Sequence, residues 1–465
     1  MMHLAQVASA TLGQLTGADT KINSVVTDSR ADCTGGLFVA LKGDNFDAHD
    51  FIHQAEVAGA AAVLVERKVQ TNLPSVQVED TLQALGRLAK WWREQFDIPL
   101  MAITGSVGKT TVKEMLAVIF SQFGEGIATK GNLNNEIGVP LTLLRLREAH
   151  RYAIVEMGMN HAGEIHRLST MAQPSVAMVN NAGAAHLEGL GSIAAVAQAK
   201  GEIFNGLKES GVAVINIDDE FCNLWQQGAA SFSQLLFGFS EQADIKASYQ
   251  TPSSLGANGS SGTLKVTMNL KNEFCSFELH SLGEHSVRNA LAAAAVASAV
   301  NVPLADIAAG LEQFRPIQGR LNIDVIGDTI VIDDTYNANP ASMNAAIDVL
   351  ASYQSSVLIV GDMAELGEAS VDEHRALGAY AQSKGITELY ACGDYAPEVV
   401  NAFDGQAVAY SCQAELLEQL PLLLCAQAGS TTVLVKGSRS ARMERVVAAI
   451  NNFLSTQLSN SSEVH

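Results

Sequence analysis

Short apolar runs alternate with helical patterns along most of the chain. In the first part, a helical pattern near 51–58 stands between apolar runs at 24–27, 37–41 and 61–65. Short apolar runs of this kind are typical of strands, and the intervening pattern is typical of a helix. This part predicts a small α/β domain that ends near residue 80.

A second block begins with a predicted connecting helix at 81–96. Strand-like runs then alternate with helical stretches, and these runs lie at 152–157, 176–180 and 212–217. The alternation predicts a mostly parallel sheet that is covered on both faces. Ligands bind at the carboxyl ends of such strands, where this chain carries Glu156, Asn180, Asn181, Asp218 and Asp219. The Ser- and Gly-rich tract 252–262 predicts a hairpin loop.

A third block follows residues 314–316 and repeats the alternation. Its strand runs lie at 329–332, 356–360, 388–391 and 432–435. Each run leads into a polar or glycine-containing turn, which predicts a second Rossmann-like domain. The whole chain therefore predicts an α/β protein of three domains, at 1–80, 81–314 and 315–465.

The segment IPLMAITGSVGKTT at 98–111 combines an apolar run, a glycine turn and the start of a helix. Gly105 and Gly108 allow backbone N–H groups to approach a phosphate closely. Lys109 can reach the terminal phosphates, and the hydroxyl of Thr110 can ligate Mg²⁺. Ile103 stands where the full G-x-x-x-x-G-K-[ST] pattern has glycine. The segment predicts a nucleotide-binding loop, and a plain strand–helix turn is the alternative.

Composition narrows the class of partner. Of the 465 residues, 48% are hydrophobic and 17% are charged, and the formal net charge is −20. This acidity argues against nucleic acid and anionic membranes, while a local cationic site still accommodates an anionic small substrate. The six Cys residues include no C-x-x-C pair, which favours a reducing cytosol over disulfides or zinc. No signal peptide is predicted, and the Ala-rich run at 289–300 is too short to span a bilayer.

Three further residues are candidates for the chemistry. Glu156 ends the run YAIVEMG. A carboxylate beside a phosphate loop commonly completes a Mg²⁺ shell, and a solvated strand-end carboxylate is the alternative. His186, in NNAGAAHLEGLG, can reach the same crevice or remain a polar residue near the surface. Lys200, in AVAQAKGEIF, reads on its own as a surface lysine of a helix.

Two later segments carry polar residues around predicted helix starts. In GEHSVRNALAAAA, His285 and Asn289 share one helix face, and Asn289 can bond an adenine edge or cap a turn. VIDDTYNANPASMNAAI crowds polar side chains into a loop before a helix that Pro340 would help to start. These side chains are Asp333, Asp334, Tyr336, Asn337 and Asn339. The loop predicts binding, and a turn with a helix cap is the alternative.

These segments together resemble those of the Mur ligases. The resemblance rests on TGSVGKTT, KGNLNNEIGVP, VEMGMNHAGEI, NNAGAAHLEGLGS, AKGEIF, GEHSVRNALAA, the pair Gly319 and Arg320, DDTYNANP and KGSR, in this order. TDSR followed by LFVALKGDNFDAHDFI is similar to the family's UDP-binding first domain, so the resemblance covers almost the whole chain. GNLNNEIGVPLTLL and DDTYNANPASMNA favour the members that add D-alanyl-D-alanine.

The resemblance implies a cytoplasmic, ATP-dependent amide ligase of peptidoglycan synthesis. Its substrates would be UDP-N-acetylmuramoyl-tripeptide and D-Ala-D-Ala, joined through an acyl phosphate. It would act as a monomer, without nucleic acid or membrane insertion. Domain 1–80 would hold the UDP end through Ser29 and Arg30, domain 81–314 would bind ATP, and domain 315–465 would bring the dipeptide. The third residue of the stem peptide, diaminopimelate or lysine, stays open.

The resemblance also implies roles for the matching residues. ATP would contact Thr104, Gly105, Ser106, Val107, Gly108, Lys109, Thr110, Thr111, Asn289, Arg320 and Asp334. One Mg²⁺ would bind Thr110 and Glu156, and a second would bind His186 and, if it is carbamylated, Lys200. The catalytic residues would be Lys109, Glu156, His186 and Lys200. Substrate contacts would come from Ser29, Arg30, Asn134, Asn135, Asn337 and Asn339. Ser286 departs from the family, which often has Asn at this position.

Two alternatives stay open at this point. One is a sibling that adds another amino acid: the diaminopimelate- or lysine-adding ligase, a cyanophycin-type ligase or folylpolyglutamate synthase. The diaminopimelate-adding ligase usually carries a DNPR-type signature, where this chain has NANPAS. The other alternative is a nucleotide-dependent switch or scaffold that hydrolyses ATP slowly, which an acidic surface would suit.

Overall fold

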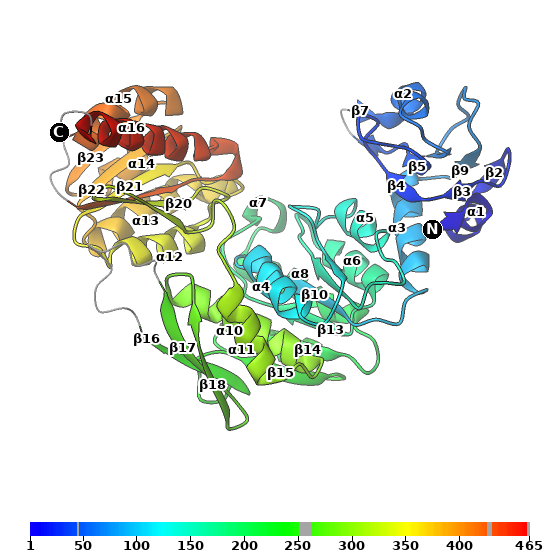
Figure 1. Cartoon of the computed structure of the whole chain (residues 1–465), viewed down its shortest axis with the longest axis horizontal. Helices are drawn as coiled ribbons and strands as arrows, with labels where there is room; N and C mark the ends of the chain where they lie inside the picture. The colour runs from blue at the N-terminus through cyan, green and yellow to red at the C-terminus, as the bar shows by residue number, and fades with distance from the viewer. Residues whose placement is uncertain (44–45, 251–262, 426–429, 463–465) are drawn as a thin grey trace.

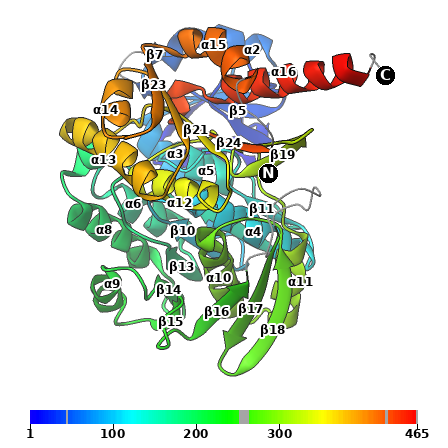
Figure 2. The ribbon, with the colours of Figure 1, turned by 90° about the vertical axis from the view of Figure 1, so that its left-hand side faces the viewer.

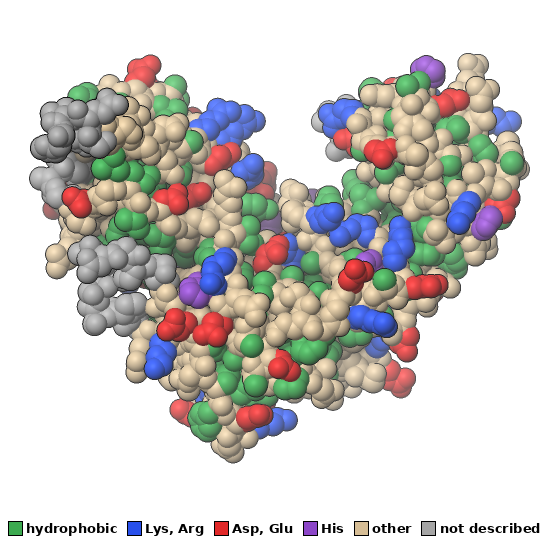
Figure 3. Space-filling model, in the orientation of Figure 1, with side chains coloured by type: hydrophobic (Ala, Val, Ile, Leu, Met, Phe, Trp, Pro, Cys, Tyr) green, Lys and Arg blue, Asp and Glu red, His purple; other side chains and the backbone are tan. Residues whose placement is uncertain are grey.

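The computed structural model describes residues 1–43, 46–250, 263–425 and 430–462, with side chains as far as 459. The chain forms three blocks, each built around its own main β-sheet (Figure 1). The first and third blocks stand at opposite ends of the central block, on the same side, and a wide hollow separates them (Figure 3). The tract 252–262, which was expected to be a hairpin loop, lies outside the described residues.

The first block is a small α/β unit. Its elements are β1 (Met2–His3), α1 (Leu4–Thr11), β2 (Gln14–Thr16), β3 (Lys21–Ile22), β4 (Ser24–Val26), β5 (Gly36–Val39), β6 (Lys42–Gly43), β7 (Phe46–Asp47), η1 (Ala48–Phe51), α2 (Ile52–Val57), β8 (Ala62–Val65) and β9 (Ser75–Gln77). The main sheet has the order β2-β9-β8-β5-β4, and only β2 runs antiparallel to its neighbour. Leu37 and Phe38 pack into different apolar cores, so both faces of the sheet are covered.

Helix α3 (Thr81–Arg93) connects the first block to the second and ends three residues earlier than predicted. Its last residue, Arg93, is only 1% exposed. The Arg93 guanidinium donates hydrogen bonds of 3.1 Å each to the carbonyl oxygens of Ile98 and Ala172. These bonds fix the segment that enters the central sheet to the end of a neighbouring helix.

The central block carries a nine-stranded sheet. Its elements are β10 (Leu100–Thr104), α4 (Lys109–Ser121), β11 (Gly126–Ala128), α5 (Gly138–Leu143), β12 (Tyr152–Glu156), α6 (Glu164–Ala172), β13 (Val176–Val179), α7 (Leu187–Leu190), α8 (Ile193–Gly201), η2 (Glu202–Gly206), β14 (Val212–Asn216), α9 (Cys222–Gly228), β15 (Ser233–Phe237), β16 (Ile245–Gln250), β17 (Leu264–Leu270), β18 (Glu273–Leu279), α10 (Glu284–Ala299) and α11 (Leu304–Gln313). The strand order is β11-β12-β10-β13-β14-β15-β16-β17-β18. Strands β11 to β16 are parallel, which confirms the mostly parallel sheet, and β17 and β18 add an antiparallel extension beside α10 and α11 (Figure 2).

The central sheet is buried on both faces, as predicted for a sheet of this type. Along β10, Leu100 and Ala102 join the core shared with α3, α5, α6 and α8. Met101 and Ile103 join the opposite core, which contains α4, α10 and α11. Successive side chains of a strand point to opposite faces, so an uninterrupted apolar run satisfies both cores.

The third block is a second doubly covered sheet, as the Rossmann-like pattern predicted. Its elements are β19 (Asn322–Ile326), β20 (Thr329–Asp334), α12 (Pro340–Leu350), β21 (Ser356–Gly361), η3 (Gly367–Ala369), α13 (Ser370–Ser383), β22 (Glu388–Cys392), α14 (Ala396–Asn401), β23 (Gln406–Tyr410), α15 (Gln413–Cys425), β24 (Thr431–Lys436), η4 (Arg439–Ala441) and α16 (Glu444–Ser462). The order is β19-β20-β24-β21-β22-β23, with only β19 antiparallel. Helices α12, α13 and α14 pack on one face, and α15 and α16 pack on the other. Within the described ranges, no helix has the length and apolarity needed to cross a membrane.

Candidate active site

The glycine loop lies between β10 and α4 in the central block. Gly108 precedes Lys109, the first residue of α4, and has a φ of 82°. A Cβ at this position would overlap Oδ1 of Asn289 and lie 2.5 Å from Nδ2 of Asn180. Glycine is therefore required both by the left-handed backbone and by the crowding. The first N–H groups of α4 have no acceptor within the helix, and such groups are suited to bind an anion.

The carboxyl end of β13 holds the glycine loop in place. The backbone N–H of Val107 donates to Oδ1 of Asn181 (2.9 Å), and Nδ2 of Asn180 donates to the carbonyl oxygen of Val107 (3.0 Å). Nδ2 of Asn180 also donates to Oδ1 of Asn289 (3.2 Å), so α10 joins the same network. The end of the neighbouring strand β14 contacts the end of β13: Nδ2 of Asn216 donates to the carbonyl oxygen of Asn180 (2.9 Å), and Oδ2 of Asp219 accepts the N–H of Ala182 (3.0 Å).

Glu156 lies beneath the loop, at the end of β12. One carboxylate oxygen accepts the Thr110 hydroxyl (2.9 Å), and the other accepts the side-chain amide of Asn134 (2.7 Å). The side chain is buried, which argues against the solvated strand-end alternative. The described residues contain no cluster of three His, Cys, Asp or Glu side chains that would form a metal cage. A hydroxyl and a carboxylate beside a phosphate loop nevertheless fit Mg²⁺, which takes one or two protein oxygens plus phosphates and water.

Two lysines approach the loop from different helices. Nζ of Lys109 donates to the carbonyl oxygen of Gly105 (2.6 Å), and burial lowers its pKa, with Arg320 adding to the effect. Lys200 lies on α8 and is 1% exposed, so its interpretation as a surface lysine was wrong. Burial, together with the charge of Lys109, lowers the pKa of Lys200 well below its ordinary value. Burial of an amine disfavours its charged form.

His186 directly precedes α7, and its side chain is mostly buried. Its Nδ1 atom is shielded from solvent and has no well-aligned hydrogen bond in the described chain. Oε2 of Glu365, in the third block, lies 2.9 Å from this nitrogen. Sequence reasoning gave Glu365 no role, because nothing local marks it as a partner of a histidine 179 positions earlier in the chain.

A second group of polar residues comes from the third block. Arg320 stacks over the ring of Tyr336, with 4.3 Å between the guanidinium carbon and the ring centroid. Nζ of Lys436 lies 2.5 Å from Oδ2 of Asp334 and donates to the carbonyl oxygen of Asn337 (2.9 Å). Lys436 is 2% exposed, so this contact is shielded from water. The segment KGSR contributed to the family resemblance, but no role was predicted for Lys436. A lysine directly after the apolar run TTVLV is nevertheless a sign of a polar site at a strand end.

Several candidate substrate residues carry local hydrogen bonds. Asn339 caps α12 by accepting the N–H of Ser342 (2.9 Å), as the turn-and-cap alternative expects. Oδ1 of Asn135 accepts the N–H of Gly138 at the start of α5 (2.9 Å). Oδ1 of Asn337 accepts the N–H of its own neighbour Ala338. Their substrate roles stay predictions.

The departure at Ser286 has a local explanation. The Ser286 hydroxyl donates to the carbonyl oxygen of Leu282 (2.7 Å) and lies 2.8 Å from the hydroxyl of Ser281. The residue is 2% exposed. Its hydroxyl is therefore engaged by the residues just before α10 and by none of the candidate site residues.

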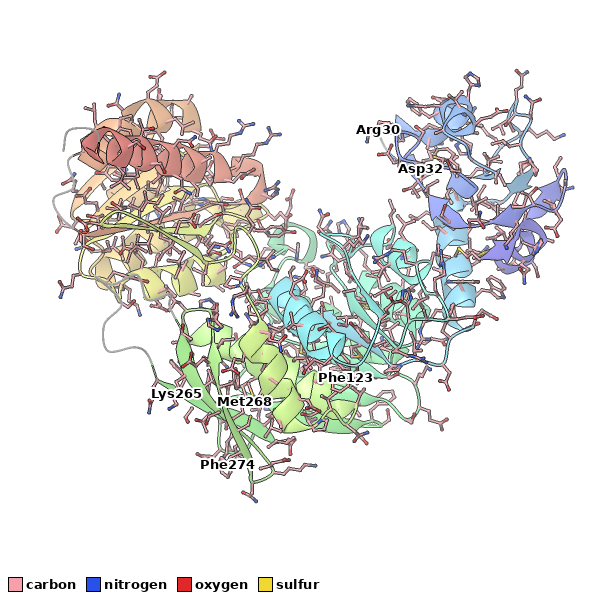
Figure 4. The ribbon with its side chains drawn as sticks, in the orientation of Figure 1. Arg30, Asp32, Phe123, Lys265, Met268 and Phe274 are labelled. Carbon is pink, nitrogen blue, oxygen red and sulfur yellow. The ribbon has the colours of Figure 1, made fainter. Side chains whose placement is uncertain are left out.

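Ser29 and Arg30 lie in the first block, away from the glycine loop. The Ser29 hydroxyl donates to Oε1 of Gln54 (3.0 Å). Arg30 forms an exposed ion pair with Asp28, and this contact lowers the pKa of the Asp28 carboxyl to about 2. Arg30 projects from the edge of the first block that borders the hollow (Figure 4). The structure thus places Arg30 across the hollow from the third block.

Three domain families match successive parts of the chain. They are the Mur ligase family catalytic domain at 21–93, the Mur ligase middle domain at 103–297, and the Mur ligase glutamate ligase domain at 319–439. A UDP-N-acetylmuramoyl-tripeptide–D-alanyl-D-alanine ligase of Escherichia coli (strain K12) is 43% identical over 96% of this chain and 98% of that enzyme. The chain belongs to the Mur ligase family. An enzyme of the same name from Bacillus subtilis (strain 168) is 34% identical to this Mur ligase, over 96% of each chain.

Solved structures agree with this membership. The crystal structure of MurF from Acinetobacter baumannii matches this Mur ligase with a TM-score of 0.90 and 37% identity, over 96% of this chain and 98% of that one. MurF from Thermotoga maritima, solved in complex with ADP, matches with a TM-score of 0.82 and 28% identity, over 95% of this chain and all of that one. The three-block architecture is therefore that of solved Mur ligases.

Proposed function

We propose that this Mur ligase joins D-Ala-D-Ala to UDP-N-acetylmuramoyl-tripeptide at the expense of ATP. The products are the UDP-N-acetylmuramoyl-pentapeptide, ADP and phosphate, and the reaction belongs to peptidoglycan precursor synthesis. The observation that carries this assignment is the similarity, over nearly the full length, to enzymes named for this reaction. The contact between the Thr110 hydroxyl and the buried Glu156 carboxylate, beside the glycine loop, supports the use of ATP.

The chemistry follows from a poor leaving group. A carboxylate does not react with an amine at neutral pH, because oxide would have to depart. Transfer of the γ-phosphoryl group of ATP to the tripeptide carboxylate gives an acyl phosphate and ADP. The dipeptide amine then attacks the acyl carbon, and the tetrahedral intermediate releases phosphate as the amide forms. The protein mainly positions these groups and screens their charge.

The central block supplies the phosphate-binding groups. The N–H groups of the glycine loop and the Lys109 ammonium face the phosphates, with Thr104, Gly105, Ser106, Val107, Gly108 and Thr111 completing the loop. Thr110 and Glu156 would hold one Mg²⁺, and His186 would hold a second together with carbamylated Lys200. Bound Mg²⁺ would neutralise phosphate charge. The lowered pKa of Lys200 favours carbamylation, because only the unprotonated form of an amine combines with carbon dioxide, releasing a proton.

The outer blocks supply the remaining contacts. Block 1–80 holds the UDP end near Ser29 and Arg30, and block 315–465 brings the dipeptide near Asn337 and Asn339. Asn289, Arg320 and Asp334 line the nucleotide site. Asn134 and Asn135 face the UDP-linked tripeptide. This arrangement needs the outer blocks to approach across the hollow during turnover. We place the enzyme in the cytoplasm and expect a monomer.

Phosphate release tests the proposal directly. We expect Mg·ATP to yield phosphate only when UDP-N-acetylmuramoyl-tripeptide and D-Ala-D-Ala are both present, with a pentapeptide product of matching mass. Replacement of D-Ala-D-Ala by free diaminopimelate or lysine separates a sibling ligase, which would respond to the amino acid instead. Release that needs no amine acceptor would favour the switch or scaffold alternative and contradict the ligase.

Lys200→Ala tests the role of the carbamylated lysine. We expect this variant to lose activity, and we expect excess bicarbonate not to restore it, because the amine that would be modified is gone. Near-normal turnover of Lys200→Ala would contradict the role. Lys208→Ala, which alters a partly exposed lysine outside the site, is the matched control.

A further inference from the structure

The loop after β21 reaches from the third block to the candidate active site. Oε2 of Glu365 lies 2.9 Å from Nδ1 of His186. Two residues further along, Gly367 faces the start of α7, because a Cβ at Gly367 would lie 3.6 Å from the Cα of Glu188. The third block thus contacts the central block at the histidine that we assign to the second Mg²⁺.

The contact supplies a partner to an atom that otherwise lacks one. Nδ1 of His186 is buried and makes no well-aligned hydrogen bond to any part of the chain that the structure describes. A small rotation of the ring or of the carboxylate would align Nδ1 with Glu365.

Backbone strain marks both residues of the pair. His186 has a φ of 59° and Glu365 has a φ of 64°, in the left-handed region that non-glycine residues seldom adopt. Strain of this kind persists only where the surrounding structure fixes the conformation, and it clusters at functional sites. Two strained residues that face each other across a block boundary indicate that both side chains are placed by the fold.

We infer that Glu365 is a positioning residue, whose carboxylate accepts the Nδ1 proton of His186 and leaves the lone pair on Nε2. Acceptors of this kind fix the tautomer and the ring orientation of metal-binding histidines. The third block therefore supplies the hydrogen-bond acceptor that orients His186 of the central block. The position of the third block then determines whether Nε2 of His186 is free to bind a cation. This inference rests on the role proposed for His186.

The tautomer of His186 is the first test, and it needs neither metal nor substrate. The 11 histidine rings are labelled with ¹⁵N in the full-length chain and observed by NMR at about pH 8, above the ordinary histidine pKa of about 6.5. His186→Asn identifies the His186 signals. We expect the proton on Nδ1 in the unaltered chain and a shift of population towards Nε2 in Glu365→Ala.

Glu368→Ala is the matched control, because Glu368 is an exposed carboxylate of the same loop without a hydrogen bond or ion pair to the described residues. We expect its spectrum to match that of the unaltered chain. The Glu365 side chain is 60% exposed, so its truncation leaves the fold intact. An unchanged tautomer in Glu365→Ala, or the same change in Glu368→Ala, overturns the inference.

The Mg²⁺ requirement is the second readout. In Glu365→Ala, we expect the Mg²⁺ concentration for half-maximal phosphate release to rise about tenfold, while the KM for ATP at saturating Mg²⁺ stays constant. An equal rise in both quantities would indicate general damage and overturn the positioning role. If the unaltered chain does not ligate the dipeptide at all, the proposed function fails, whereas the tautomer measurement still reports on Glu365.

Discussion

Gly108→Ala tests whether the glycine loop is the nucleotide site. The new methyl carbon would overlap Oδ1 of Asn289 and lie 2.5 Å from Nδ2 of Asn180. The left-handed φ of 82° costs an L-residue about 1–2 kcal/mol. Overpacking adds about 1–3 kcal/mol, and loss of the Asn180–Asn289 hydrogen bond adds about 1 kcal/mol. The total cost is about 3–6 kcal/mol, and much of it falls on the loop that contacts phosphate.

The assay is ADP binding by calorimetry, together with urea unfolding. A loop displaced by the overlap would weaken ADP binding about 10- to 100-fold, because each 1.4 kcal/mol of distortion costs a factor of about ten. Gly131→Ala is the matched control: its φ is 53°, and nothing lies within 4 Å of the added carbon. We expect this control to lose some stability and to keep its ADP affinity. ADP affinity within about twofold of the unaltered chain in Gly108→Ala would refute the reasoning.

Three further predictions concern buried charges. Glu156→Gln removes the charge beside Thr110, and we expect the Mg²⁺ requirement of phosphate release to rise at least about tenfold; an unchanged requirement would contradict the assigned role. Lys436→Met leaves the Asp334 carboxylate, 14% exposed, without its cation. In urea titrations, we expect the free energy of unfolding of Lys436→Met to be about 3 kcal/mol lower than that of the unaltered chain. Adding Asp334→Asn should restore part of this loss. An unchanged free energy of unfolding in Lys436→Met would contradict the pairing. Because burial lowers the pKa of Lys200, the unfolded chain binds more protons there than the folded chain, so stability rises with pH between the lowered value and about 10.5. Lys200→Met should flatten this rise in urea titrations without carbon dioxide, and an identical slope would contradict the burial argument.

Local patterns predicted the elements that bury apolar surface. The runs at 152–157 and 176–180 became β12 and β13, because an uninterrupted apolar segment satisfies both cores of a covered parallel sheet. The hairpin loop predicted at 252–262 implied antiparallel strands on either side of it, where β16 and β17 pair, but no strand bounds were predicted there or for β18. Their burial is mixed, and their place at the edge of the sheet depends on neighbouring strands.

The site residues also fall into those that local motifs predicted and those that depend on tertiary packing. Thr110 and Glu156 meet because β10 and β12 are parallel neighbours that pair Ile103 with Glu156, and the motifs already suggested this. Lys200 was misjudged on its own residues, because α8 has small apolar residues around most of its surface and no pattern shows that the lysine faces inward. The contacts of Glu365 and Lys436 depend on how separate segments pack together, which no local pattern encodes.

The central claim is that the tripeptide carboxylate is activated by phosphorylation before the amine attacks. The most direct measurement uses UDP-N-acetylmuramoyl-tripeptide with both oxygens of the reacting carboxylate labelled with ¹⁸O, and mass spectrometry of the phosphate released with D-Ala-D-Ala. An acyl phosphate transfers one labelled oxygen to phosphate in each turnover, and the other stays in the new amide. We predict singly labelled phosphate in step with pentapeptide formation. Unlabelled phosphate, formed at the same rate as the product, would contradict the account.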